Sequence, residues 1–526
     1  MKTIILSNFL LLIVVISNCQ NRSNVWMLGG YGTNIYPSPA INFNSGQADT
    51  FSLARQMGFF ITNTSICDTM GNLLFYTNGN YIANANHDTL QNSEYYNPGY
   101  ASIINSNQLN IVQGALILPM PGNDSLYYVF HVSGEQFTAY NQLQQQPLQL
   151  SFSIVNIKLD SMRGGIIAGQ KNIAILNDTL TNGMITACKH GNGRDWWITV
   201  PRFYSNKYYK FLLTDTGLAG PFSQNIGSPI VYDIGSQASF SPQGDSYAQV
   251  NIDNTLNIFK FDRCTGLFYD NTFIQIPNPT LGLPDNEAFG LAFSPSGQYL
   301  YIVLYTKIVQ YDTWATNIAS TQTYVADWDT AYNPFATYFL LAQLAPDGKI
   351  YIGTYGSCYT LHYIDQPDVG GVACNVVQNS FPLAAVPNHG VPTFPNYDLG
   401  AKVGSPCDTL THLTPALSKG EGAIRLAPNP ANNYFYIKYE IPINENLLFV
   451  LYDSYGKEVL RKNLYGSFKN LLVHTEQLNN GIYFWRAVSE LVGGAPLSKR
   501  RGAGPAPTAV SGGEVGAASG KIIILH

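Results

Sequence analysis

A chain of 526 residues is long enough for two to four domains of ordinary size. Charged residues make up only 12% of it and the formal net charge is −5, so there is no basic surface to neutralise phosphates and we expect no nucleic-acid partner. Tyr (35) and Phe (27) are abundant, and aromatic side chains suit the half-buried faces of β-sheets.

The N-terminus has the pattern of a secretory signal peptide. A short positive region, Met1–Thr3, precedes an apolar run from Ile4 to Ile16 that is too short to span a bilayer, and no later stretch is long and apolar enough. We expect a signal peptide over 1–19, no transmembrane segment, and a protein that is secreted or held at the outer cell surface after passing the periplasm. Cleavage before Cys19, with lipidation of that residue, stays open as an alternative.

The six cysteines after Cys19 lie in a compartment that permits disulfides. The sequence contains no C-x-x-C, which excludes zinc ribbons and thioredoxin-like motifs. Cys358 and Cys374 flank one expected pair of strands and are the predicted bridge, with unpaired buried thiols as the alternative.

A turn signature recurs through the first 400 residues. In each copy a glycine-bearing tight turn leads into an aromatic and β-branched run, and the glycines are at positions 71, 122, 193, 244, 297 and 348. Their spacings are 51, 71, 51, 53 and 51 residues. A period near fifty with β patterning is typical of the blades of a β-propeller.

Six markers predict six blades. Seven blades are the alternative, if residues 366–398 build a sheet of their own. The long interval predicts an insertion near Gln142–Gln149 and the turn at Gly164 and Gly165. We expect residues 25–31 to pair with the last blade and close the ring, which hides the exposed edges of an open sheet.

Several ordered blocks in this region resemble the propeller module of large surface proteins in the Bacteroidetes. They are GNLLFYTNG (71–79), HGNGRDWW (190–197), FDRCTG (261–266), LAFSPSGQYLY (291–301), QLAPDGKIYIG (343–353) and VPTFPNYDLG (391–400). The resemblance implies a surface location and carries no biochemical role with it.

The last hundred residues carry a second ordered set of motifs. Its members are Pro428, Asn429 and Pro430 at the start, Gly456 in a turn, Gly481 and Tyr483 in a strand, and Lys521 in a terminal apolar run. The set resembles the C-terminal sorting domain of type IX secretion cargo in the Bacteroidetes. The resemblance implies a small β-sandwich and the type IX secretion machinery as a partner.

Together these patterns predict an all-β protein. A six-bladed β-propeller, or a seven-bladed one, spans 25–400 and is followed by a small β-sandwich C-terminal sorting domain at 427–526. The intervening residues 401–426 have the composition of a linker. A low-complexity insertion rich in Gly, Ala, Pro and Ser interrupts the sorting domain at about 491–520.

The search for chemistry finds few candidates. The sequence has no G-x-S-x-G, H-E-x-x-H, EF-hand or P-loop motif and no pair of histidines spaced for a metal, so we expect no metal and no cofactor. Asp285, Glu287, Asp327 and Asp329 are the nearest candidates for glycoside chemistry, but each lies in a polar loop where acids are usually solvated, and we favour that explanation.

Binding residues are the stronger prediction. His190, Asn192, Arg194 and Asp195 form a polar group beside Trp196 and Trp197, and an Arg next to indoles can bind a carboxylate or a sugar face. The alternative is a structural turn in which the two indoles pack on opposite faces of a strand.

Exposed aromatic residues offer a second kind of binding site. Trp328, and with it Tyr31, Tyr81 and Trp314, are candidates for a glycan-stacking platform. We therefore predict a non-catalytic propeller that binds a glycan, a protein or another surface partner. A secreted hydrolase or lyase with a site in the propeller channel is the alternative.

Overall fold

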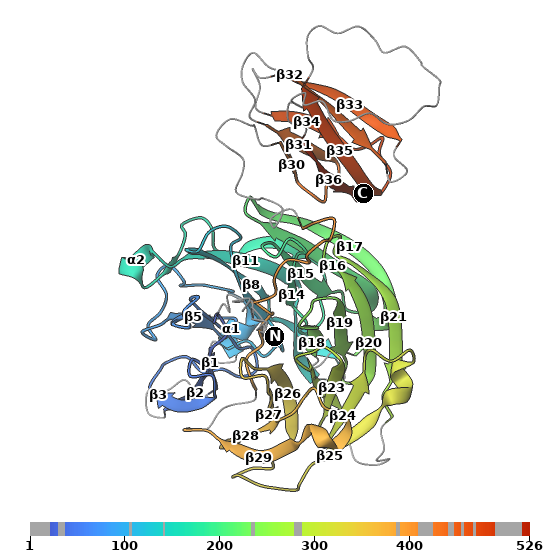
Figure 1. The fold of residues 1–526 in the computed structure, drawn as a ribbon. Coiled ribbons are helices and arrows are strands. Elements are labelled where there is room, and N and C mark those ends of the chain that lie inside the picture. The colour runs from blue at the N-terminus through green and yellow to red at the C-terminus, as the bar shows by residue number, and fades with distance from the viewer. Residues whose placement is uncertain are drawn as a thin grey trace, which may run out of the picture.

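The computed structural model of the protein describes residues 21–29, 37–104, 108–139, 142–232, 237–277, 287–385, 390–408, 424–439, 446–453, 457–465, 470–489 and 518–525. Within these residues nearly all regular structure is antiparallel β-strand (Figure 1). The helices are short: α1 (Tyr100–Ile104), α2 (Leu159–Met162), and the 3₁₀ turns η1 (Ile318–Thr321) and η2 (Gly371–Cys374). No helix in the described part has the length and apolarity needed to cross a membrane.

Apart from one two-stranded hairpin described below, the strands up to residue 385 form seven sheets in the described part of the chain, arranged as a ring in Figure 1. The first three sheets contain β1 (Val25–Met27), β2 (Ser38–Asn42), β3 (Asp49–Leu53); β4 (Thr64–Cys67), β5 (Leu73–Thr77), β6 (Ile82–Asn84); and β7 (Ala115–Pro119), β8 (Leu126–Val132), β11 (Gln149–Asn156), β12 (Gly165–Ile166), β13 (Ile173–Asn177). The next two contain β14 (Thr186–Lys189), β15 (Trp196–Pro201), β16 (Ser205–Thr214), β17 (Gly217–Ile230); and β18 (Gln237–Phe240), β19 (Ser246–Val250), β20 (Thr255–Asp262), β21 (Leu267–Gln275). The last two contain β22 (Ala288–Phe293), β23 (Tyr299–Leu304), β24 (Lys307–Asp312), β25 (Thr323–Asp327); and β26 (Phe339–Leu344), β27 (Ile350–Thr354), β28 (Thr360–Ile364), β29 (Val376–Pro382).

Within each sheet the strands follow chain order, except that β13 pairs with β11 in the third, and this order is the meander of a propeller blade. The first strands of successive sheets lie next to one another, as in the contacts of β1 with β4, β18 with β22 and β22 with β26. The first strand of each sheet therefore faces the centre of the ring. The protein is a β-propeller, and the seven sheets correspond to the alternative blade count.

The recurring glycines explain the period. All six lie in the turn between the first and second strand of a sheet, and all have positive φ between 70° and 86°. Gly193 shows a second requirement, because a Cβ there would lie 2.4 Å from the backbone nitrogen of Ala401. The turn thus needs glycine both for its backbone angle and for the close approach of a distant segment.

The expected closure by residues 25–31 is wrong. Val25 and Met27 pair with Asn42 and Ala40 in a sheet of their own, and residues 30–36 lie outside the described residues. A nearby antiparallel partner forms with less loss of chain entropy than one more than 300 positions away. The first and last sheets instead meet through side chains, with Trp26 and Tyr351 at 5.8 Å between ring centroids.

The source of the seventh sheet also differs from the expectation. Residues 366–398 contribute η2 and β29, and β29 is the outer strand of the last sheet. The extra sheet is the N-terminal one, which carries no copy of the glycine marker that made the repeat visible.

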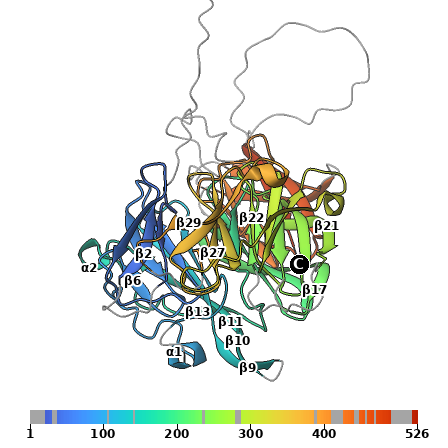
Figure 2. The same cartoon turned by 90° about the horizontal axis from the view of Figure 1, so that it is seen from below.

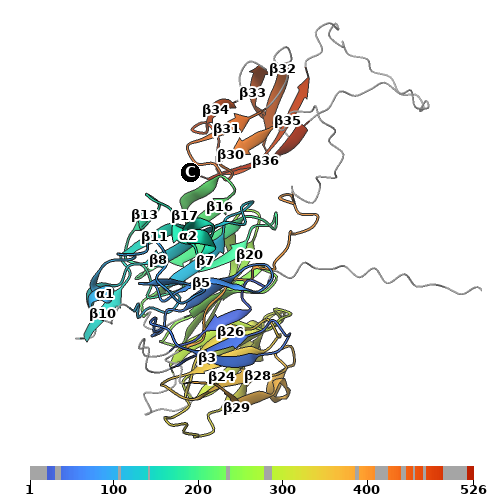
Figure 3. The same cartoon turned by 90° about the vertical axis from the view of Figure 1, so that its left-hand side faces the viewer.

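The predicted insertion is confirmed as a hairpin. Strands β9 (Glu135–Ala139) and β10 (Gln142–Gln146) pair with each other between β8 and β11. Figures 2 and 3 show this hairpin and α1 at the same end of the ring. The additional residues of the third sheet therefore form a hairpin that extends one end of the propeller.

Residues 390–408, here called the central segment, run among the inner strands of the ring. The amide of Phe394 donates to Gln343 Oε1 at 3.1 Å, and the hydroxyl of Tyr397 donates to the carbonyl of Ile117 at 2.8 Å. Both aromatic rings join the cores of the surrounding sheets. This segment fills space along the axis of the ring.

The end of the central segment is covalently attached to the ring. Cys407 forms a disulfide with Cys264 in the turn between β20 and β21, and Lys402 donates its amide to the Gly191 carbonyl at 2.8 Å. The predicted Cys358–Cys374 bridge is wrong. Those two thiols are buried and unpaired, because they lie at opposite ends of the last sheet: Cys358 in the connection between β27 and β28, and Cys374 in η2 between β28 and β29. Packing to the ring continues past residue 400, into the part expected to be linker.

The C-terminal strands form two facing sheets. One contains β30 (Arg425–Ala427), β31 (Tyr434–Lys438) and β34 (Asn470–His474), and the other β33 (Glu458–Tyr465), β32 (Asn446–Tyr452), β35 (Gly481–Ser489) and β36 (Ala518–Ile524). They enclose one apolar core that includes Phe449, Trp485 and Ile522. This is the predicted small β-sandwich.

The sandwich includes the last strand, although the low-complexity residues precede it. Lys521 pairs with Phe484, and Tyr483 pairs with Ile522. Asn429, in the Pro-Asn-Pro start, accepts a hydrogen bond from the Ile523 amide at 2.9 Å. The described sorting residues therefore converge on β36; Gly456 and residues 490–517 lie outside the described part.

Candidate functional site

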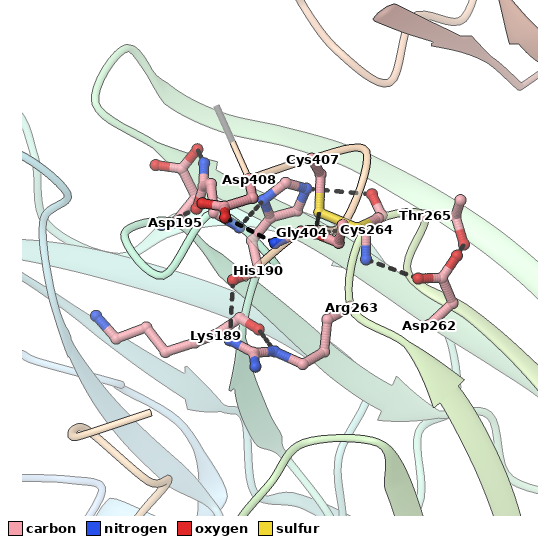
Figure 4. Close-up of a disulfide and its surroundings, with 12 residues drawn as sticks. Lys189, His190, Asp195, Asp262, Arg263, Cys264, Thr265, Gly404, Cys407 and Asp408 are labelled. Atoms are coloured by element: carbon pink, nitrogen blue, oxygen red, sulfur yellow. Dashed lines mark hydrogen bonds between the residues drawn. A yellow bond between two sulfur atoms is a disulfide. The ribbon is translucent and has the colours of Figure 1, made fainter. Parts of the chain in front are cut away.

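The structure brings His190, Asn192, Arg194 and Asp195 together in the turn between β14 and β15. Figure 4 shows His190 and Asp195 of this turn beside the disulfide. Asn192 Nδ2 donates to Asp195 Oδ2 at 2.8 Å, and Arg194 Nε donates to Asp195 Oδ1 at 2.7 Å. Arg194 Nη1 donates to Asp215 Oδ2 at 2.8 Å. The polar groups of this turn cluster are bonded mainly to each other.

The imidazole of His190 joins the turn cluster to the disulfide. Its Nδ1 bonds the Asn192 amide at 3.1 Å, and its Nε2 bonds the carbonyl of Cys264 at 3.1 Å (Figure 4). Burial lowers the pKa of His190, and the nearby Asp195 opposes that shift in part. Both ring nitrogens thus have partners within the protein.

The two adjacent indoles pack on opposite faces of β15, as the structural alternative predicted. Trp196 is fully buried against Tyr397, with ring centroids 5.8 Å apart. Trp197 is buried on the other face, and its Nε1 donates to the Arg263 carbonyl at 2.9 Å. Neither indole offers a face to a ligand, and the binding role of the turn cluster stays a prediction.

Trp328 lies away from the turn cluster, in the loop between β25 and β26. Consecutive strands in a sheet run in opposite directions, so successive loops alternate between the two ends of the ring. The loops β23–β24, β25–β26 and β27–β28 share one end. The β14–β15 turn lies at the other end. The structure therefore separates the predicted binding residues into two places.

Trp328 belongs to a connected group of aromatic side chains from these three loops, here called the aromatic rim. The rings of Trp328 and Tyr338 are 4.2 Å apart, and Tyr338 stacks on Tyr305 at 4.2 Å. Tyr332 meets Trp328 at 6.0 Å, and Tyr355 meets Tyr305 at 5.3 Å. We define the aromatic rim as Tyr305, Trp328, Tyr332, Phe335, Tyr338, Tyr355 and Tyr359.

The outer members of the aromatic rim are exposed. Tyr332 is 68% exposed, Phe335 58%, Tyr355 47% and Tyr359 46%. Single exposed apolar residues are common, but a group of large rings at one end of the molecule is not. The rim presents flat apolar faces to solvent while its inner rings, including Trp328, are partly buried.

Backbone hydrogen bonds hold the rim loops together. The amide of Tyr359 donates to the Asn333 carbonyl at 2.9 Å, and the amide of Tyr355 donates to the Tyr338 carbonyl at 2.9 Å. Beneath them His362 Nε2 bonds the Thr337 carbonyl at 2.8 Å. Rings on bonded loops lose less freedom when they bind a partner.

Polar groups border the rim. Asp327 pairs with Lys307 at the end of β25, and Asp329 accepts from the Ala331 amide at 3.0 Å. Carboxylates of this kind can accept hydrogen bonds from hydroxyl groups of a ligand. Of the other candidate acids, Asp285 lies outside the described residues.

The remaining members of the predicted aromatic platform do not join the rim. Trp314 is 64% exposed in the β24–β25 connection, at the opposite end of the ring. Tyr81 bonds Thr89 at 2.5 Å in the second sheet, and Tyr31 lies outside the described residues. Sequence analysis missed Tyr332, Phe335, Tyr355 and Tyr359. The aromatic density of 328–338 was the available signal.

Glutamine side chains connect inner strands across the ring. Gln113 exchanges two hydrogen bonds with the backbone of Ala238, at 2.8 and 2.9 Å. Gln237 donates to the Ala342 carbonyl at 2.7 Å and accepts from the Leu291 amide at 3.1 Å. Together with the central segment, these amides occupy the axis, where many propellers have an open channel.

A scan against protein-family models finds one match, a secretion system C-terminal sorting domain at residues 425–491. No curated protein matches the chain. Among solved structures, a protein of unknown function from Desulfotomaculum acetoxidans is 11% identical with a TM-score of 0.37, covering 71% of this chain and 100% of that one. A quinoprotein alcohol dehydrogenase-like protein from Bacteroides thetaiotaomicron is 13% identical with a TM-score of 0.35, covering 70% and 77%. The Cps50 (Swd1) beta-propeller domain of Myceliophteria thermophila is 9% identical with a TM-score of 0.29, covering 72% and 93%.

The family match and the sandwich agree on residues 425–491. The tail is a C-terminal sorting domain, which directs export by type IX secretion to the cell surface or the extracellular space. The fold of the remaining chain is established by its own sheets, since TM-scores this low add nothing to them.

Proposed function

We propose that the exported propeller is a non-catalytic binding protein and that its ligand is a glycan held on the aromatic rim. One observation carries the proposal: two neighbouring loops place four exposed tyrosine and phenylalanine rings at one end of the ring, around the partly buried and stacked Tyr305, Trp328 and Tyr338. Sugar rings present apolar C–H faces that stack on aromatic rings, while hydroxyl groups need polar partners close by.

The surroundings favour a glycan over a protein partner. Asp327 and Asp329 border the rings, and the sequence of the three rim loops contains no arginine. Binding hot spots between proteins are enriched in arginine as well as in aromatic residues. A tyrosine-rich surface with carboxylates at its edge matches the mixture of C–H and O–H groups on a sugar.

The hydrolase or lyase alternative has less support. A catalytic channel needs room for a substrate between convergent groups. Here the described axis contains Gln113 and Gln237, whose amides donate to backbone carbonyls, and the central segment, where the Phe394 amide donates to Gln343 Oε1. These contacts weigh in favour of recognition without chemistry.

The test is binding of the mature protein to soluble bacterial and plant polysaccharides in affinity electrophoresis. We expect retardation by at least one polysaccharide, and a loss of at least tenfold in affinity for the double variant Tyr332→Ala, Phe335→Ala. Trp314→Ala is the matched control, because it removes an equally exposed ring from the opposite end. Equal binding by the rim variant and the control would contradict the proposal.

A further inference from the structure

A pocket of about 300 Å³ with both polar and apolar walls lies in the third sheet, apart from the aromatic rim. Its walls come from the loop before α1, the connection that follows β8, and strands β11 and β13. The connection after β8 occupies the same place in its sheet as the β23–β24 loop does in the sixth. The pocket therefore opens at the rim's end of the ring.

The pocket walls are held in place by their own hydrogen bonds. Asn97 Nδ2 donates to the Val132 carbonyl at 2.9 Å, and the Asn97 amide donates to Asn172 Oδ1 at 3.1 Å. Gln149 Nε2 donates to Asn177 Oδ1 at 2.7 Å. Because these amides fix each other, the pocket keeps its shape before a ligand arrives, which lowers the entropy cost of binding.

His131 lies in the pocket wall, and its two ring nitrogens are buried there without a hydrogen-bond partner. Its side chain is on β8 and is only 2% exposed, and neither Nδ1 nor Nε2 makes a hydrogen bond. The ring contacts Tyr96 edge-on at 4.5 Å. A buried polar group without a partner typically costs about 1–3 kcal/mol. A ligand that bonds this ring would recover part of that cost.

Burial also fixes the charge of His131. It lowers the pKa of the imidazole to about 3, so the ring is neutral at physiological pH. A neutral imidazole has one N–H donor and one nitrogen acceptor. A hydroxyl group, which both donates and accepts, can satisfy either nitrogen.

Glu135 supplies the charge of the pocket. It is half-buried at the start of β9, and its carboxylate forms no ion pair among the described residues. No lysine or arginine lines the pocket, so an anionic ligand would meet only a like charge. Most of the remaining wall residues carry amides or hydroxyls, such as Asn97 and Ser133, and Pro98 and Leu148 add apolar surface that suits the C–H groups of a sugar.

We infer that this pocket is a second binding site, which takes a single neutral sugar unit or a polyol of that size. The volume is at the lower end of the roughly 300–1,000 Å³ of small-molecule sites. Glu135 accepts hydrogen bonds from ligand hydroxyls, and His131 bonds a hydroxyl at the bottom. The site shares no residue with the aromatic rim and stands whether or not the rim binds a glycan.

The experiment titrates the full mature protein with D-glucose, D-galactose, D-mannose and D-xylose separately, using isothermal titration calorimetry and the ¹⁵N signals of the His131 ring. Glu135→Gln removes the charge and keeps the shape. His131→Phe keeps the ring contact with Tyr96 and removes both nitrogens. Glu94→Gln is the control, because Glu94 bonds Lys171 through its backbone carbonyl and does not line the pocket.

We expect saturable binding of at least one sugar that shifts the His131 nitrogens and weakens at least tenfold in Glu135→Gln, with Glu94→Gln unchanged. The sugar affinity of His131→Phe is interpreted only if this variant unfolds at the same temperature as the parent protein. If it does not, the affinity of Glu135→Gln decides the test. D-glucosamine is titrated as a fifth compound. The inference is overturned if none of the four neutral sugars binds at concentrations up to about 20 mM, which is about 20 times a dissociation constant of 1 mM. It is also overturned if only D-glucosamine binds, which would assign an ammonium ligand. It also fails if binding is lost in Tyr332→Ala, Phe335→Ala but kept in Glu135→Gln, because the sugar would then sit on the rim.

Discussion

The turn cluster at His190–Asp195 and the aromatic rim around Trp328 look alike in the sequence and differ in the structure. Both combine aromatic rings with charged or amide side chains between two strands. In the turn cluster Arg194 and Asn192 donate to Asp195, and the two indoles are buried. In the rim, Tyr332 and Phe335 point their rings to solvent.

The difference shows what separates a fold-stabilising cluster from a binding surface. Hydrogen-bond capacity that is used inside the protein stabilises the fold, and capacity or apolar area left facing solvent is available to a partner. If this comparison is right, changes in the turn cluster lower stability, and changes in the outer rim lower binding with little effect on stability.

The largest effect is expected at the disulfide beside the turn cluster. The Cys264–Cys407 bridge closes a loop of 143 residues, and in the chain-entropy model such a bridge stabilises the fold by about 4–5 kcal/mol. The double variant Cys264→Ala, Cys407→Ala should lose most of that free energy of unfolding in guanidinium titrations.

Reduction provides the control for this prediction. Dithiothreitol should destabilise the parent protein and leave the double variant unchanged. Cys374→Ala removes a buried thiol that forms no bridge, so that variant should keep its sensitivity to reduction. A parent protein that is indifferent to dithiothreitol would contradict the bridge.

The next largest effect is expected for Asp195→Ala. Asp195 is buried and accepts from Arg194 and Asn192, so its removal leaves a half-buried guanidinium with Asp215 as its one remaining carboxylate. We expect a loss of about 2–3 kcal/mol in the free energy of unfolding. Polysaccharide binding by the folded fraction should be unchanged, and a selective loss of binding would move the site to the turn cluster.

A pH effect is expected from His362, which lies under the rim. Burial lowers its pKa to about 4, against 6.5 in an unfolded chain. The unfolded state therefore binds more protons between these values, so stability is complete above pH 6.5 and falls as the pH drops toward 4.

The size of this effect is on the order of 2–3 kcal/mol across that range. It is measured by guanidinium unfolding at pH 7.5, 5.5 and 4.5. The variant His362→Gln should reduce the pH dependence of the unfolding free energy, because it removes the titrating imidazole that bonds the Thr337 carbonyl. Since His131 is also buried with a lowered pKa, part of the slope remains in that variant. An unchanged slope in His362→Gln would contradict the assignment.

The sequence predicted the all-β fold because the glycine turns repeat. Positive φ at positions such as Gly244 and Gly297 is a local requirement, so it leaves a regular mark on the chain. The first sheet and the Cys264–Cys407 bridge left no such mark. They depend on which distant surfaces meet in the closed ring, as do the contacts of Trp26 with Tyr351.

The same limit applies to the candidate sites. Residue type identified Trp328 and Arg194, because aromatic and charged residues near turns are visible in any sequence. It did not reveal that Arg194 is bonded to two carboxylates, or that Tyr355, 27 positions from Trp328, belongs to the same surface. Burial and bonding across loops are properties of the folded chain.

The smallest effect on stability, and the sharpest comparison, is expected for Tyr355→Ala. Half of this ring is in solvent, so its removal should cost less than about 1 kcal/mol of folding free energy. One stacking contact on a ligand contributes about 0.5–1.5 kcal/mol, which corresponds to a 2- to 12-fold loss of polysaccharide affinity. Trp314→Ala, at the opposite end, should match the parent in both measurements. If Tyr355→Ala instead unfolded the protein without altering the affinity of its folded fraction, the rim would be a stabilising cluster like the one at Asp195.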